Sequence, residues 1–150
     1  MNIAIIGAGN VGGALGGSWA RAGHTIVYGV RDPRADKTQA LLAATGAGAR
    51  AVLVGEAARG AEVVALATPW DATQAALTAA GDLSGKVLID CTNPLRFTPG
   101  IGLELSIGIS DSGGETVARW ARDQSPVSAA AGSTGSALPR RSRARSLRAP

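Results

Sequence analysis

The sequence predicts an α/β fold built on a doubly wound parallel sheet of about five strands. Short runs of branched apolar residues alternate with longer segments rich in Ala and Leu, as strands and helices do when they alternate along a chain. Most of these runs and segments end at glycine, a residue that commonly terminates strands and helices. The first run passes directly into a glycine-rich turn and a helical segment. This alternation predicts parallel pairing with right-handed crossovers.

Composition places the chain among ordinary globular proteins. Its 150 residues suit a single domain with a buried core, and 45% of them are hydrophobic. One Cys and one His exclude a disulfide framework and any multi-Cys or His-based metal cluster. The N-terminus carries no basic leader, and no uncharged stretch is long enough to span a bilayer. We therefore expect a cytoplasmic protein with no membrane segment.

The net charge of +4 arises in the last part of the chain. Residues 1–124 carry ten Lys and Arg against eleven Asp and Glu, whereas residues 140–148 carry five Arg and no acid. A basic tail can bind nucleic acid, but this one lacks interleaved aromatic residues and a surrounding fold. We expect no nucleic-acid partner.

The chain divides into predicted elements that follow one another in order. Asp32 followed by Pro33 predicts a helix cap and a first-turn proline, and Ser112 with Glu115 has capping-box spacing. Residues 91–111 are predicted to form a Gly/Pro-rich loop. Strands are expected at 3–6, 25–28, 62–67 and 86–90, with a short one possible at 51–54. Helices are expected at 11–22, 33–44, 71–80 and 112–122, with a helical turn at 56–59.

The chain changes character after residue 123. Residues 125–150 are almost entirely Ser, Ala, Gly, Pro and Arg, too poor in apolar side chains to order themselves. We predict a domain over 1–121 and a disordered or aberrant tail over 122–150. An abrupt switch of this kind is what out-of-frame reading of GC-rich DNA produces. We then expect a truncated sheet that ends at 86–90 with an open edge prone to association.

A glycine fingerprint over residues 7–12, GAGNVG, matches G-x-G-x-x-G between a predicted strand and a predicted helix. Its first glycine permits the tight turn, its second lets a pyrophosphate approach the backbone, and its third lets the helix pack closely. The helix N-terminus offers N–H groups to the phosphates. The motif predicts a dinucleotide-binding Rossmann domain with cofactor contacts at Gly7, Gly9, Asn10, Val11 and Gly12; the alternative is a glycine-rich turn in an unrelated α/β fold.

The end of the second predicted strand favours NADP over NAD. NAD-selective domains place an acid there against the ribose 2′-hydroxyl, and here Arg31 follows instead. A guanidinium can pair with a 2′-phosphate and stack on adenine. Arg34 and Lys37 are nearby supplements. The alternative is that Arg31 is a solvated loop residue.

Five stretches together resemble a known family, the NADPH-dependent reductases of the deazaflavin coenzyme F-420, and the related oxidoreductase domains of membrane metalloreductases. They are IIGAGNVGGALG, AGHTIVYGVRDP, EVVALATPW, KVLIDCTNPL and SGGETVARWA, which begin at residues 5, 22, 62, 86 and 112. The resemblance covers about residues 1–121. The combination of T-P-W, C-T-N-P and S-G-G-E is far more specific than the glycine loop.

This resemblance implies hydride transfer between NADPH and a flat flavin-like acceptor, with a homodimer in the full-length family form. Arg31 falls at the family's 2′-phosphate position, although Val30 replaces the usual Ser before it. The nicotinamide end of the site is implied to include Thr68, Pro69, Trp70, Asn93 and Pro94. The cofactor carries the hydride, so no dedicated catalytic side chain is required.

Several alternatives stay open from the sequence. The chain could be a truncated NADP(H)-binding module without an acceptor site, or another reductase of the superfamily, such as one acting on pyrroline carboxylate. Trp70 could serve packing or line the cofactor cleft. Plain structural roles are expected for His24 in a turn, Cys91 at a strand end, and Trp19 and Trp120 within helices.

Overall fold

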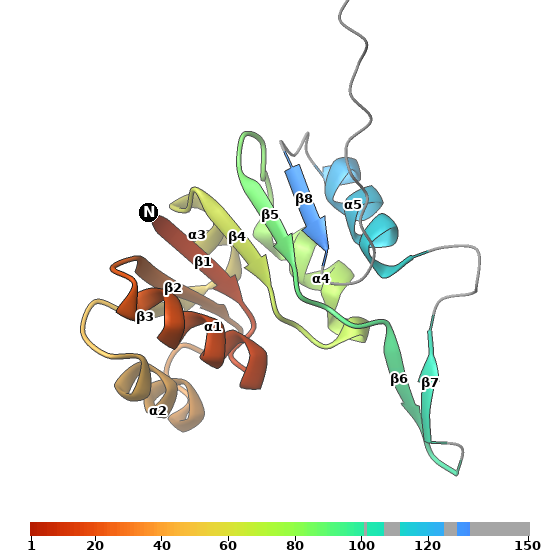
Figure 1. The fold of residues 1–150 in the computed structure, drawn as a ribbon, viewed down its shortest axis with the longest axis horizontal. Helices are drawn as coiled ribbons and strands as arrows, with labels where there is room; N and C mark the ends of the chain where they lie inside the picture. The colour runs from red at the N-terminus through yellow and green to blue at the C-terminus, as the bar shows by residue number, and fades with distance from the viewer. Residues whose placement is uncertain (101, 107–111, 125–128, 133–150) are drawn as a thin grey trace, which may run out of the picture.

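The computed structural model describes residues 1–100, 102–106, 112–124 and 129–132 (Figure 1). Its centre is a six-stranded parallel sheet of order β3-β2-β1-β4-β5-β8. The chain crosses over beside β1, so that successive elements extend the sheet in both directions, as a doubly wound fold requires. The strands are β1 Asn2–Ile6, β2 Thr25–Val30, β3 Arg50–Leu53, β4 Val63–Leu66, β5 Val87–Asp90 and β8 Ala129–Gly132.

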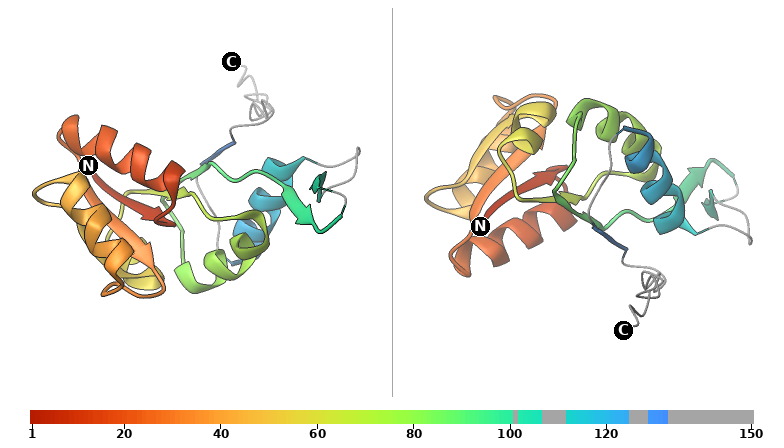
Figure 2. Two further views of the ribbon diagram at one scale, coloured as in Figure 1. Left: turned by 90° about the horizontal axis from the view of Figure 1, so that it is seen from below. Right: turned by 90° about the horizontal axis from the view of Figure 1, so that it is seen from above.

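Helices cover both faces of this sheet (Figure 2). They are α1 Asn10–Arg21, α2 Asp36–Thr45, α3 Val54–Arg59, α4 Trp70–Ala80 and α5 Gly113–Gln124. Side chains of α1 and α2 pack on one face, and side chains of α3, α4 and α5 pack on the other. Successive residues of β1 alternate between these two core clusters, with Ile3 and Ile5 in one and Ala4 and Ile6 in the other. Burial on both faces explains why β1 and β4 are continuous apolar runs.

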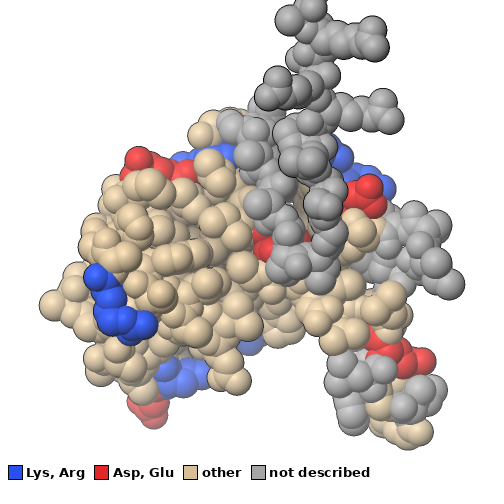
Figure 3. Space-filling view, viewed as in Figure 1, with Lys and Arg blue, Asp and Glu red and all other residues tan. Residues whose placement is uncertain are grey.

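Charge is dispersed on the face shown in Figure 3. There the described Lys and Arg side chains are separated by uncharged residues, with Asp and Glu side chains among them. No helix within the described ranges is long and apolar enough to cross a membrane.

Two glycines let α1 lie directly on the sheet. A Cβ on Gly12 would overlap the carbonyl oxygen of Gly7, and a Cβ on Gly16 would overlap the Tyr28 hydroxyl. That hydroxyl lies 2.8 Å from Thr45 Oγ1, which in turn donates to the Leu41 carbonyl. Tyr28 is therefore the donor to Thr45, and one buried side chain connects β2 with α2 beneath α1.

The predicted cap at Asp32 and Pro33 is wrong. Helix α2 begins at Asp36, and Ala35 at its N-cap makes no side-chain capping bond. The Asp32 carboxylate instead accepts a bond from the Arg34 amide at 2.9 Å, and the Asp32 carbonyl accepts one from Thr38 Oγ1 at 3.1 Å. An Asp side chain can close a local turn of this kind in competition with helix capping.

The region predicted as a loop over 91–111 contains two strands. They are β6 Leu95–Thr98 and β7 Gly102–Leu105, an antiparallel pair outside the main sheet. The helix that follows begins as predicted, because Ser112 and Glu115 form a capping box. Glu115 N donates to Ser112 Oγ at 3.1 Å, and Ser112 N donates to Glu115 Oε2 at 3.2 Å.

The predicted open edge at β5 is also wrong. β8 pairs with β5 in parallel, with Ala130 opposite Leu88, and it lies inside the segment expected to hold no strand. Ladder hydrogen bonds are made by the backbone, so a run of Ala can add a strand without branched side chains. Helix α5 runs to Gln124, past the predicted domain boundary. The other residues of the predicted tail, 125–128 and 133–150, lie outside the described residues.

The close contact of Gly16 with Tyr28 gives a stability prediction. Gly16→Ala should lower the free energy of unfolding by about 1–3 kcal/mol, because the added methyl group must displace a fully buried ring. Gly17→Ala is the matched control: its Cβ would approach nothing closer than Arg21 Nη1 at 3.5 Å, and it should be neutral or stabilising by up to about 1 kcal/mol. Urea denaturation of both variants checks this, and equal effects would contradict it.

Candidate functional site

The glycine loop begins where β1 ends. Gly7 has φ +112°, a conformation that side chains other than glycine rarely adopt, and its amide donates to the Gly29 carbonyl at 3.2 Å. A Cβ at Gly7 would also overlap the carbonyl oxygen of Ala67. The turn is therefore held between the ends of β2 and β4, and it directs the chain into α1.

The start of α1 is open to solvent. Gly9 is its N-cap residue, is exposed, and makes no side-chain capping bond. A Cβ built on Gly9 meets no atom within 4 Å, so the space above it is free. The first-turn N–H groups and the positive end of the helix dipole face that space. This arrangement suits a phosphate group.

A cavity of about 1240 Å³ runs along the carboxyl ends of β1, β2, β4 and β5. In a doubly wound sheet, ligands bind at this edge, beside the point where the strand order reverses. Ten of the thirteen residues proposed from the sequence line it: Gly7, Gly9, Asn10, Val11, Arg31, Lys37, Thr68, Pro69, Trp70 and Asn93. Arg34 and Pro94 are not among the lining residues, and neither is Gly12, which is buried where α1 packs against Gly7.

Two cations stand at one end of the cavity. Arg31 follows β2 and Lys37 lies in the first turn of α2; both are exposed and both line the cavity. Arg34 is exposed on the turn between them and is not among the lining residues. Lys37, rather than Arg34, is therefore the second cation that lines the cavity with Arg31.

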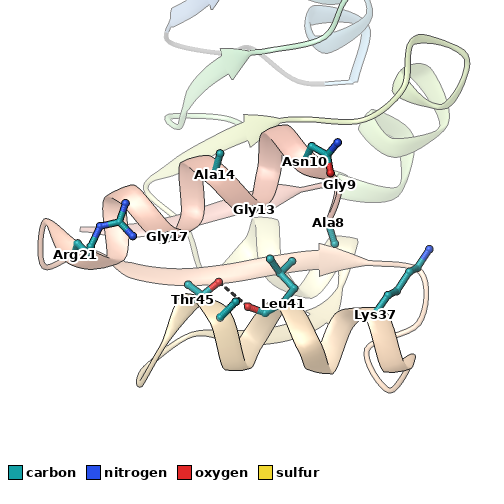
Figure 4. A pocket seen from close by; sticks show the side chains of 11 residues that line it. Ala8, Gly9, Asn10, Gly13, Ala14, Gly17, Arg21, Lys37, Leu41 and Thr45 are labelled. Carbon is teal, nitrogen blue, oxygen red and sulfur yellow. Dashed lines mark hydrogen bonds between the residues drawn. The ribbon is translucent and has the colours of Figure 1, made fainter.

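A shallower groove of about 470 Å³ continues from this end between α1 and α2 (Figure 4). Gly13 and Gly17 line it on the α1 side, and a Cβ on Gly13 would come within 3.0 Å of Leu41 Cδ1 on α2. Figure 4 shows Asn10 and Lys37 at the end shared with the cavity and Arg21 at the opposite end.

The T-P-W segment forms the wall after β4. Thr73, fully buried in α4, donates to the Pro69 carbonyl at 3.1 Å, and its hydroxyl lies 3.0 Å from Thr68 Oγ1. The Trp70 ring packs against Trp120 of α5, with centroids 5.3 Å apart and planes tilted by 34°. Trp70 is 8% exposed and also lines the cavity, so packing against α5 does not prevent it from facing a ligand there.

The end of β5 is held by a buried carboxylate. Asp90 accepts bonds from Thr92 N at 2.9 Å and from Thr92 Oγ1 at 2.7 Å, which turns the chain toward Asn93. Cys91, between them, lines the cavity. Burial, with a further contribution from the Asp90 charge, raises the pKa of the Cys91 thiol. The thiol therefore stays protonated near neutral pH and is a poor nucleophile.

The sequence reasoning missed the apolar side of the cavity. Four alanines of α4 line it, together with Val54 at the start of α3 and Leu95 at the start of β6. The spacing of the alanines along α4 places them on one helical face, a signal that could have been found in the sequence. They are Ala72, Ala75, Ala76 and Ala79.

Comparison with known proteins identifies related chains. Residues 2–94 match the model of a family described as coenzyme F-420-dependent NADP oxidoreductase. A search of curated proteins gave no match.

Solved structures give further matches. A proposed F-420-dependent NADP reductase from Arthrobacter sp. FB24 is 34% identical, with a TM-score of 0.75 over 85% of this chain and 60% of that one. A hypothetical protein from Sinorhizobium meliloti is 28% identical, with a TM-score of 0.62 over 81% of this chain and 57% of that one. An imine reductase from Streptomyces aurantiacus is 25% identical, with a TM-score of 0.52 over 63% of this chain and 33% of that one. This chain thus spans 60% or less of each of these relatives.

The Cys91 environment gives a prediction about reactivity. The rate of alkylation by iodoacetamide should be low at pH 7 and should rise at a higher pH than for a cysteine in an unstructured peptide, because the raised pKa keeps the thiolate fraction small. Mass spectrometry of samples alkylated between pH 6 and pH 10 measures this profile. Alkylation at pH 7 faster than that of the peptide would contradict the assignment.

Proposed function

Because this chain belongs to the family of coenzyme F-420-dependent NADP oxidoreductases, we propose that it binds NADP(H) and transfers hydride between NADPH and a deazaflavin or flavin ring. The observation that carries the proposal is the cavity itself. It joins an uncapped helix N-terminus, a pair of cations and an apolar helix face along the carboxyl edge of the sheet. These are the groups needed by a pyrophosphate, a 2′-phosphate and an adenine ring, in that order.

The lining residues support one direction for the cofactor. The pyrophosphate would lie over Gly9, the 2′-phosphate between Arg31 and Lys37, and the adenine toward the alanines of α4. The nicotinamide would then lie toward Thr68 and Asn93. The Asp32 carboxylate also reaches this cavity, but it accepts the Arg34 amide within its own turn. This supports NADP(H) over NAD(H), because the acid expected of an NAD site is held in the turn.

The chemistry proposed is a two-electron transfer. When bound, NADPH would supply a hydride equivalent to the acceptor ring and leave as NADP⁺, with the accompanying proton drawn from solvent. The residues at the nicotinamide end, Thr68 and Asn93, would position the ring that donates the hydride. Among the described residues that line the cavity, none is required as an acid or base for this step.

A second candidate function is cofactor binding without turnover. The chain spans 60% of the Arthrobacter relative, so part of that protein has no counterpart here. An acceptor site that depended on the uncovered part would be incomplete, and the chain would then hold NADP(H) only. The match to an imine reductase keeps a C=N acceptor, including pyrroline carboxylate, as a further candidate substrate.

The cation pair predicts cofactor preference. Arg31→Ala should weaken NADPH binding at least roughly tenfold and leave NADH binding nearly unchanged, because it removes a charge-assisted contact to the 2′-phosphate. Lys37→Ala should have an effect in the same direction. Isothermal titration with both cofactors measures the two dissociation constants.

Arg34→Ala is the matched control for this pair, since Arg34 is an exposed arginine of the same turn that does not line the cavity. It should change NADPH binding by less than Arg31→Ala. The assignment of Arg31 to the 2′-phosphate would be contradicted if Arg31→Ala weakened NADPH and NADH binding equally. It would also be contradicted if Arg34→Ala weakened NADPH binding as much as Arg31→Ala.

The acceptor proposal predicts which oxidant is reduced. Oxidised coenzyme F-420 or riboflavin should be reduced by NADPH in the presence of the protein, whereas pyrroline-5-carboxylate should not. Absorbance of NADPH at constant protein concentration follows all three reactions. NADPH binding without any turnover would favour the binding-module alternative, and turnover of the C=N substrate alone would contradict the ring acceptor.

A further inference from the structure

The base of the β6–β7 hairpin carries two leucines on one face. The antiparallel register places Leu95 directly opposite Leu105. Residues directly opposite each other in an antiparallel pair project their side chains to the same face of the ribbon. Leu95 and Leu105 therefore form an apolar surface at this end of the hairpin.

The base of the hairpin is fixed at the proposed nicotinamide end of the cavity. Asn93 and Leu95 line the cavity, and the Pro94 carbonyl between them accepts the Ser106 amide at 2.7 Å. Pro94 also packs against Gly113, where an added Cβ would come within 3.1 Å of the proline ring. These contacts join the start of β6, the end of β7 and the start of α5 at one point.

The hairpin then extends away from the main sheet (Figures 1 and 2). Leu105 is 66% exposed, although its register partner Leu95 is half-buried on the cavity wall. Two antiparallel strands without a further layer are only marginally stable in water. An apolar hairpin face continuous with a ligand cavity therefore points to an occupant that enters from that cavity.

We propose that the apolar face at the hairpin base, formed by Leu95 and Leu105, is the surface on which the acceptor's flat ring system rests while its reacting edge faces the nicotinamide. This inference rests on the proposed function, and it assigns the acceptor a wall. Two adjacent leucines offer shape and apolar contact but no hydrogen bonds. The wall therefore selects for a broad fused ring and gives no advantage to a small polar C=N substrate.

A second copy of the chain is the competing occupant of this face. Leu105 lies opposite Leu95 in the hairpin, and Leu95 lines the cavity. This favours the ring, because a ring in the cavity beside the nicotinamide would contact Leu95. A dimer contact would need no such continuity.

The test is Leu105→Ser, with Leu53→Ser as the matched control. Both leucines are large and exposed, 66% and 57%, and Leu53 lies on β3 at the far edge of the sheet. The NADP⁺-saturated protein is titrated into oxidised coenzyme F-420 and into riboflavin, and the fluorescence of each ring reports its dissociation constant. The same titrations are repeated without cofactor, and NADPH affinity and sedimentation velocity are measured for each variant.

Leu105→Ser should weaken ring binding by roughly fivefold to tenfold through lost apolar contact and leave NADPH affinity unchanged, while Leu53→Ser should alter neither. Ring binding that is absent in the wild type, or equally affected in both variants, would overturn the inference even if NADPH binds. A dimer dissociated by Leu105→Ser with ring affinity intact would overturn it in favour of the second copy. Failure of the wild type to bind NADPH would instead refute the proposed function, and the cofactor-free ring titration would still decide the role of the hairpin.

Discussion

The approach of α1 to the glycine loop is the contact on which the rest of the structure depends. A Cβ on Gly12 would overlap the carbonyl oxygen of Gly7, so the absence of a side chain there lets the first turn of α1 lie on the end of β1. A side chain at Gly12 would push α1 away from the sheet. The open N-terminus of the helix would then no longer stand over the cavity, and the α1 face of the core would separate from Ile3 and Ile5. Fold and site are thus set by the same backbone contact.

Much of this was predictable because it depends on local chemistry. The alternation of elements, the glycine turn and the Ser112 capping box follow from short-range rules, and the structure confirms them. The ten cavity residues could be named in advance because the carboxyl ends of parallel strands meet at one edge. Trp70 was left with two possible roles; its position against Trp120 shows the packing role, and contact with a cofactor stays a prediction.

Most of the failures have a different cause, which is a non-local or competing contact that the sequence does not reveal. The Asp32 carboxylate has two possible uses, and the turn to the Arg34 amide prevailed over the cap. The hairpin of β6 and β7 was missed because its residues lie in a segment rich in Gly and Pro, a composition that predicts a loop. β8 was missed because its pairing with β5 needs only backbone groups, which composition does not reveal. The face that four alanines form on α4 was missed because alanine indicates a helix and does not by itself indicate a residue that lines a cavity.

The way in which α2 is attached has a thermodynamic consequence. This helix buries one residue fully, Thr38, begins without a side-chain cap, and is joined to β2 through the Tyr28 and Thr45 hydroxyls. Helices with so little buried surface open locally at a lower free energy than the rest of a domain. Lys37 lies in its first turn, so an anion held between Lys37 and Arg31 would favour the closed helix by its own binding free energy. Anion binding in the cavity would therefore stabilise α2. Conversely, a substitution in α2 that lowers the stability of the helix would weaken the affinity for the anion, even if the substituted residue makes no contact with it.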